Sequence, residues 1–153
     1  MYYFLLMCFF SAMAVHCYTD MREQLLYDKV NVFLAGCGLW YGYFFTSPQV
    51  YLTGALVMGG IMLSIYWASR GGMGGGDVKL AFALGLWLGV MQGILCLLLS
   101  FVLGGVIGIV LCCSGRKKVS EAIPFGPCLC LGGTVALLWG TQIISWYLGL
   151  FSV

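Results

Sequence analysis

The sequence predicts an all-α membrane protein with about six transmembrane helices. Hydrophobic residues make up 62% of the 153-residue chain and charged residues only 8%, whereas a soluble domain carries about 25% charged residues. The mean hydropathy is +1.02. The charged residues gather in three short segments, which long uncharged runs separate. We therefore expect residues 1–153 to form one transmembrane domain in a lipid bilayer, without a soluble domain.

The first uncharged runs predict three spans. Residues 1–19 lack the Lys or Arg that a signal peptide needs before its apolar segment, so we expect them to form the first span. Residues 30–69 are too long for one crossing, since a helix rises about 1.5 Å per residue and the apolar core is about 30 Å thick. Pro48 divides this run into spans at 30–45 and 50–68.

The second half of the chain predicts three more spans. Residues 80–115 are uncharged and long enough for about two crossings. A turn is expected at 89–93, after a short fourth span that begins near Asp77. The fifth span is expected at 94–113 and the sixth at 128–151.

The distribution of charge predicts the orientation. Segments 20–29, 69–79 and 114–127 fall on one side of a six-span topology and contain all seven Lys and Arg and all five Asp and Glu. Cytoplasmic loops collect Lys and Arg. We therefore expect the charged side to face the cytoplasm and both termini to lie on the other side. The net charge of +2 is too small to indicate a nucleic-acid partner.

The segment 70–79 combines five glycines with one carboxylate, Asp77. A carboxylate beside apolar helices is costly and by default marks a functional site. The glycines, among them Gly74 and Gly76, permit close backbone approach and unusual dihedral angles. The pattern of a phosphate-binding loop, G-x-x-x-x-G-K-[ST], is not present.

Asp20 is the expected partner of Asp77, because it ends the first span on the same side of the membrane. Two neighbouring carboxyl groups tend to share one proton. The ionised member can then take a proton from water while the protonated member donates to a substrate carbonyl. This pattern predicts peptide hydrolysis. The alternative is that Asp20, Glu23 and Asp28 only mark the interface and orient the protein.

Metal and cofactor sites are not expected. None of the eight cysteines forms a C-x-x-C pair, and His16 is the single histidine, so the usual ligand spacing is missing. We expect the cysteines to be small buried side chains and His16 to be packed or interfacial.

Three landmarks resemble one known family, the type IV prepilin peptidases. Residues 73–80, Met-Gly-Gly-Gly-Asp-Val-Lys-Leu, contain the G-x-G-D signature of intramembrane aspartic proteases and resemble the prepilin peptidases in particular. Asp20 lies where these enzymes have their first aspartate. The run Ile-Pro-Phe-Gly-Pro at 123–127 resembles a segment that precedes their last span. The chain is similar to the short form of the family, which lacks the cysteine-containing domain linked to N-methylation.

The resemblance implies an aspartic endopeptidase in the inner membrane of a prokaryote. Such an enzyme removes the basic leader from prepilins or pseudopilins at the cytoplasmic face, after a glycine and before the hydrophobic helix of the pilin. It implies that Asp20 and Asp77 form the catalytic pair. Gly74 and Gly76 let the loop approach Asp77 and the substrate, and Lys79 tunes Asp77 or holds the loop.

Two alternatives stay open at this stage. Tyr27-Asp28 resembles the Tyr-Asp motif of presenilin-like proteases, which makes Asp28 the reserve candidate for the first aspartate. A non-enzymatic membrane scaffold or transporter of a secretion or pilus system is the alternative function. Transporters usually place ionisable groups near the middle of the membrane, whereas every charge here lies outside the long apolar runs.

Overall fold

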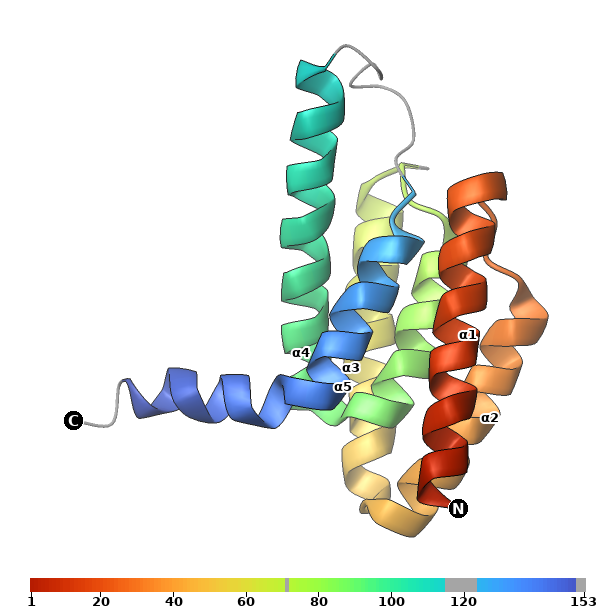
Figure 1. The fold of residues 1–153 in the computed structure, drawn as a ribbon, viewed down its shortest axis with the longest axis vertical. Helices are drawn as coiled ribbons and strands as arrows, with labels where there is room; N and C mark the ends of the chain where they lie inside the picture. Colours follow the sequence, from red (N-terminus) through yellow and green to blue (C-terminus); the bar gives the residue numbers. More distant parts are fainter. Residues whose placement is uncertain (71, 115–123, 151–153) are drawn as a thin grey trace.

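The computed structural model describes residues 1–70, 72–114 and 124–150, which form five α-helices (Figure 1). These ranges contain no β-strand, so the predicted all-α class is confirmed. Arg116, Lys117, Lys118, Glu121 and the end of the expected sixth span lie outside the described residues. In chain order the helices are α1 (Tyr2–Glu23), α2 (Asp28–Phe45), α3 (Pro48–Ala68), α4 (Gly75–Cys113) and α5 (Gly126–Gly149).

The predicted count of six helices is not confirmed, because residues 89–93 do not form a loop. The helical path of α4 is interrupted only at Gly89, whose φ of 68° and ψ of −172° lie in a region essentially restricted to glycine. In Figure 1 the first half of α4 runs beside α3, and the second half turns back alongside α5. One glycine therefore reverses the chain where the sequence predicted a separate turn.

Four of the described helices, α1, α3, α4 and α5, are long and apolar enough to cross a membrane. These four helices support the prediction of a multi-pass membrane protein. The 18-residue α2 is not among the four, so a span at 30–45 is not supported; its first turns carry Asp28, Lys29 and Asn31. The expected break before α3 is confirmed, and Pro48 opens that helix, where its missing N–H needs no partner.

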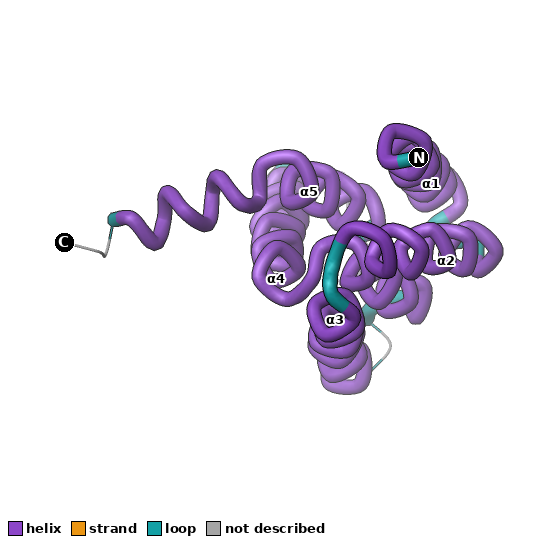
Figure 2. Tube along the Cα trace, turned by 90° about the horizontal axis from the view of Figure 1, so that it is seen from below, coloured by secondary structure: helices purple, strands orange, loops and turns teal. Residues whose placement is uncertain are grey.

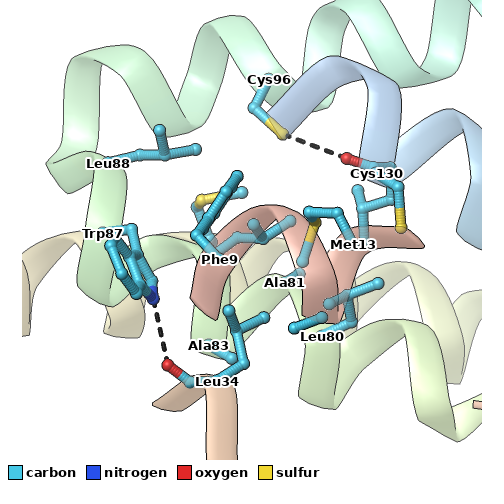
Figure 3. Packing of buried hydrophobic residues seen from close by; sticks show 14 of the residues in the cluster. Phe9, Met13, Leu34, Leu80, Ala81, Ala83, Trp87, Leu88, Cys96 and Cys130 are labelled. Atoms are coloured by element: carbon cyan, nitrogen blue, oxygen red, sulfur yellow. Dashed lines mark hydrogen bonds between the residues drawn. The ribbon is translucent and has the colours of Figure 1, made fainter. Parts of the chain in front are cut away.

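The first half of α4 forms much of the core. Trp87 stacks edge-on against Phe9 of α1, with ring centroids 5.0 Å apart, and its Nε1–H donates to the Leu34 carbonyl of α2 at 3.0 Å (Figure 3). On the α3 side, a Cβ on Gly54 would lie 2.5 Å from the Gly85 carbonyl oxygen. The two backbones therefore touch at a point that only glycine permits.

The remaining helices are arranged around this core. Seen from below in Figure 2, the second half of α4 lies beside α5, and the end of α5 points away from the bundle. The last turn of α1 and the first turns of α4 and α5 lie at the same end of the bundle, which is at the top of Figure 1. This end is where the chain places the aspartates that the sequence singled out.

Candidate active site

Asp20 lies in the last turns of α1 and is held by the beginning of α5. Its side chain is 6% exposed, and its Oδ2 accepts a 2.9 Å hydrogen bond from the Gly126 N–H. The first N–H groups of a helix have no partner inside the helix, and the helix dipole favours a negative charge there. A Cβ at position 126 would lie 2.7 Å from Asp20 Oδ2, so the glycine makes this contact sterically possible.

Asp77 lies in the first turn of α4 and is 7% exposed. Its backbone N–H donates to the Gly74 carbonyl at 3.1 Å, which begins the helix. Its Oδ1 is buried and accepts no hydrogen bond from the described residues. Such an orphaned carboxyl oxygen is uncommon in a folded protein and calls for an explanation.

The fold brings Asp20 and Asp77 together. The two carboxyl groups interact electrostatically, although 56 residues of chain lie between them. Cys128, which is buried one half-turn after Gly126, is within electrostatic range of both. Three helices therefore enclose the pair, and the sequence analysis did not single out Gly126 or Cys128. Their signal was the Pro-Phe-Gly-Pro run, which marked the segment without indicating a contact to Asp20.

The glycines before Asp77 act through their small size. A Cβ on Gly76 would lie 2.9 Å from Cβ of Leu26, in the connection between α1 and α2, and a Cβ on Gly74 would lie 3.2 Å from Asp77 Oδ2. Among the described glycines only Gly89 has a positive φ. The expectation of unusual dihedral angles in this loop is therefore wrong for its described glycines, whereas close approach is what they provide.

Lys79 pairs with Asp28. Its Nζ lies 2.7 Å from both carboxylate oxygens of Asp28, and the side chains are 57% and 63% exposed, respectively. The ion pair connects the first turns of α4 and α2. Lys79 thus contacts α2 at the surface. The reserve candidate Asp28 lies in this exposed pair, whereas Asp20 and Asp77 are both buried.

Two further polar side chains, His16 and Asn31, are buried in α1 and α2. His16, one helical turn before Asp20, is fully buried, and Asn31 of α2 is 4% exposed. They lie near each other, but neither makes a hydrogen bond of ordinary geometry within the described part of the chain. The sequence predicted a packed His16 and gave no signal for Asn31. Among the described residues, no three His, Cys, Asp or Glu are placed to hold a metal ion.

Comparison with known proteins assigns this arrangement to a family. The model of the type IV leader peptidase family matches residues 7–109, which contain both Asp20 and Asp77. The chain belongs to the type IV leader peptidase family. The resemblance noted in the sequence is thereby confirmed. The match ends before α5, so the contact from Gly126 to Asp20 comes from outside the matched part.

Curated relatives of this leader peptidase family match most of the chain. The prepilin leader peptidase/N-methyltransferase of Legionella pneumophila is 34% identical over 143 residues, which are 86% of this chain and 48% of the relative. The protein of that name from Aeromonas salmonicida (strain A449) is 39% identical over 142 residues, with 86% and 47% covered. That from Stutzerimonas stutzeri is 40% identical over 136 residues, with 84% and 47% covered. The chain thus spans about half the length of the curated relatives it matches. No solved structure matches it significantly.

Proposed function

We propose that this chain is an aspartic endopeptidase that removes the leader from prepilins or pseudopilins at the cytoplasmic face of the inner membrane. The observation that carries the proposal is the burial of two carboxyl groups, Asp20 and Asp77, within electrostatic range of each other at one end of an apolar bundle. Membership of the leader peptidase family supports it, as do relatives named as prepilin leader peptidases. Residues 1–153 then act as one transmembrane protease domain.

The surroundings of the two aspartates suggest their roles. Asp20 receives the Gly126 N–H at the beginning of α5, which favours the charged carboxylate. The Gly74 backbone also stabilises the Asp77 carboxylate, but Oδ1 of Asp77 is buried without a donor among the described residues and Asp20 repels its charge, so Asp77 carries the proton that the pair shares. Asp20 therefore takes a proton from the attacking water, and Asp77 donates its proton to the oxygen of the scissile carbonyl.

The second half of the reaction restores the pair. The tetrahedral intermediate returns a proton from its hydroxyl group to Asp77 as the carbonyl forms again and the carbon–nitrogen bond breaks. The departing amine takes the proton that Asp20 received from water. Each carboxyl group is then in its starting state, and both act as acid and base in one cycle.

The substrate follows from the resemblance and from the place of the site. A prepilin carries a basic leader before a hydrophobic helix, and the bond to be cleaved lies between them. A pair of carboxyl groups at the polar end of an apolar bundle lies at the level of the membrane where that boundary in the prepilin would be. The leader can stay in water while the pilin helix stays in the lipid.

The topology is part of the proposal. The end with the two aspartates faces the cytoplasm, because the described Lys and Arg residues, Arg22, Lys29, Arg70 and Lys79, are in the last turns of α1 and α3 or the segments after them and in the first turns of α2 and α4. Both termini lie on the other side when α2 and each half of α4 cross the membrane, which gives six crossings from five helices. The 18 residues of α2 are about 27 Å long, close to the apolar thickness of about 30 Å.

Only leader cleavage is proposed for this chain. The names of the relatives also contain N-methyltransferase, but the chain spans about half of their length, and the aspartate pair accounts for hydrolysis alone. The non-enzymatic scaffold or transporter is not favoured, since the chain belongs to a peptidase family.

Co-expression with a prepilin tests the proposal, with leader removal followed on a gel. Asp20→Asn and Asp77→Asn should each slow cleavage by about 100-fold or more while the protein still inserts into the membrane. Glu23→Gln is the matched control, because this exposed carboxylate is near Asp20 in the same helix and binds the Tyr27 hydroxyl instead. Normal processing by either Asn variant would remove that residue from the site.

The same assay separates Asp28 from Asp20. Asp28→Asn breaks an exposed ion pair and leaves the buried pair intact, so cleavage should remain measurable. A loss as complete as that of Asp77→Asn would instead make Asp28 the first catalytic aspartate.

A further inference from the structure

A groove runs between α2 and α3, with the first half of α4 as its floor. Its volume is about 660 Å³. It opens to the outside of the bundle, where Leu56 is 68% exposed, and a Cβ on Gly60 would meet no atom within 4 Å. Its apolar walls include Val32 and Ala35 of α2, Leu56 and Leu63 of α3, and Val78 and Phe82 of α4.

The groove also contains a polar end. Asp28 and Lys79, which form the exposed ion pair, contribute to its lining, as does Asn31. Lys79 and Val78 directly follow Asp77 in the first turns of α4, so this end of the groove is the one nearest to the aspartate pair. The apolar length of the groove extends from there toward the middle of the bundle.

The side chain of Asn31 has hydrogen-bonding groups that the rest of this lining does not satisfy. Its side chain is 4% exposed, and both its Oδ1 and Nδ2 are buried without a hydrogen bond of ordinary geometry. A buried amide without partners is costly. One bond to the neighbouring His16 would satisfy only part of an amide that has two donors and an acceptor. The free capacity indicates a ligand with polar backbone atoms.

We propose that the groove binds the hydrophobic helix of the prepilin, with the start of that helix at Asn31 and Asp28. This inference rests on the proposed function and names where its substrate docks. The first N–H groups of a helix are unpaired, and Asn31 Oδ1 can accept one of them. Asp28 lies at the same end of the groove, but its carboxylate is already paired with Lys79, so the start of the helix is recognised by Asn31. An amphipathic or apolar helix in such a groove is a common recognition mode.

A lipid chain is the other apolar molecule that could occupy a groove open to the bilayer. It would fill the apolar part of the groove but would offer no N–H group to Asn31 Oδ1. The ion pair of Asp28 with Lys79 at the polar end does not select between the two occupants by charge. A helix that starts with free N–H groups matches the buried acceptor of Asn31. The groove also directs the bond before that helix toward Asp77.

Two glycine variants test the docking by kinetics. Gly60→Leu fills the groove, whereas Gly105→Leu adds the same side chain to an exposed position in the second half of α4, where a Cβ also meets nothing within 4 Å. With purified enzyme and full-length prepilin, Gly60→Leu should raise KM about 10-fold and leave kcat unchanged. Gly105→Leu should stay within about two-fold of the wild type. Equal KM values for the two variants would overturn the groove assignment.

Asn31→Leu provides a second variant with a separate readout. It removes a buried amide whose neighbour is His16, so the melting temperature should change by no more than about 4 °C, while KM for the prepilin rises. A lower melting temperature together with an unchanged KM would assign Asn31 a purely structural role and count against the proposal.

Photo-cross-linking separates this inference from the proposed function. A photoreactive phenylalanine analogue at Leu56, in the Asp77→Asn background, should capture the prepilin, and the same analogue at the exposed Leu98 of α4 should not. Capture from both positions, or only of lipid from position 56, overturns the docking site. If the wild-type enzyme cleaves prepilin but position 56 captures none, the groove fails and the protease stands. If the wild type does not cleave, the proposed function fails, and capture at position 56 alone would retain the docking site.

Discussion

At the scale of single residues, the candidate site is a pair of aspartates in unlike surroundings. Asp20 receives a backbone N–H from the start of α5, and Asp77 has one buried oxygen that receives nothing from the described residues. This asymmetry, rather than the mere presence of two acids, is what assigns the base and the acid in the proposed reaction. It depends on Gly126, which allows Asp20 to approach the helix.

Gly126→Ala should therefore impair turnover. The new Cβ would lie 2.7 Å from Asp20 Oδ2, so the carboxyl group must move and lose its hydrogen bond, and misplacement by a fraction of an ångström to 1 Å lowers rates by about 10- to 100-fold. The measurement is kcat for leader cleavage by the purified enzyme. Gly149→Ala, at the far end of α5, is the control, because its Cβ meets nothing within 4 Å. Wild-type turnover in Gly126→Ala would show that this contact has no part in catalysis.

At the scale of elements, glycines shape α4 in two different ways. Before Asp77 they leave room for neighbouring atoms with ordinary backbone angles, so that the first turn of α4 packs against Leu26. At Gly89 a glycine instead supplies a positive φ that reverses the helix. The first use could be anticipated from the sequence, since a run of glycines next to a carboxylate signals close approach. The place of the second was also expected, since a turn was predicted at 89–93. That Gly89 alone would reverse the chain, without a loop, could not be predicted, because nothing local distinguishes it from Gly93.

Gly89→Ala should destabilise the fold. A φ of 68° with a ψ of −172° costs a non-glycine residue about 1–3 kcal/mol, and the new Cβ would lie 2.8 Å from Val50 Cγ1. The free energy of unfolding in detergent should fall by about that amount. Gly36→Ala in α2 should change it in the opposite direction, by about 0.5–1 kcal/mol, because its Cβ meets nothing within 4 Å. An unaltered stability of Gly89→Ala would contradict the strained reversal.

At the scale of the whole molecule, the sequence predicted what depends on local chemistry. The helical class, the break at Pro48 and the segregation of charge follow from residue types and their spacing. The contacts of Asp20 with Gly126 and of Lys79 with Asp28 join segments that are remote in the chain. They depend on which helices pack together, and no local pattern indicates that. For the same reason Asp20 could be proposed as the partner of Asp77 from topology, while the residue that holds Asp20 could not.

The orientation in the membrane can be measured with terminal reporters. The proposed topology puts the charged segments in the cytoplasm and both termini on the other side, so alkaline phosphatase fused to either terminus of the full chain should be active. Green fluorescent protein at the same positions should stay dark. Fluorescence at both termini would reverse the orientation, and fluorescence at one terminus would mean an odd number of crossings.

The central claim is that Asp20 and Asp77 act as one catalytic unit, and a double-variant cycle tests it most directly. The measurement is kcat for prepilin cleavage by Asp20→Asn, Asp77→Asn and the variant with both changes. When two residues act as one catalytic unit, replacing either of them lowers the rate about as much as replacing both. We predict that each single change lowers kcat by about 100-fold or more and that the double change lowers it no further. Losses that multiply in the double variant, or a single variant with wild-type kcat, would contradict the pair.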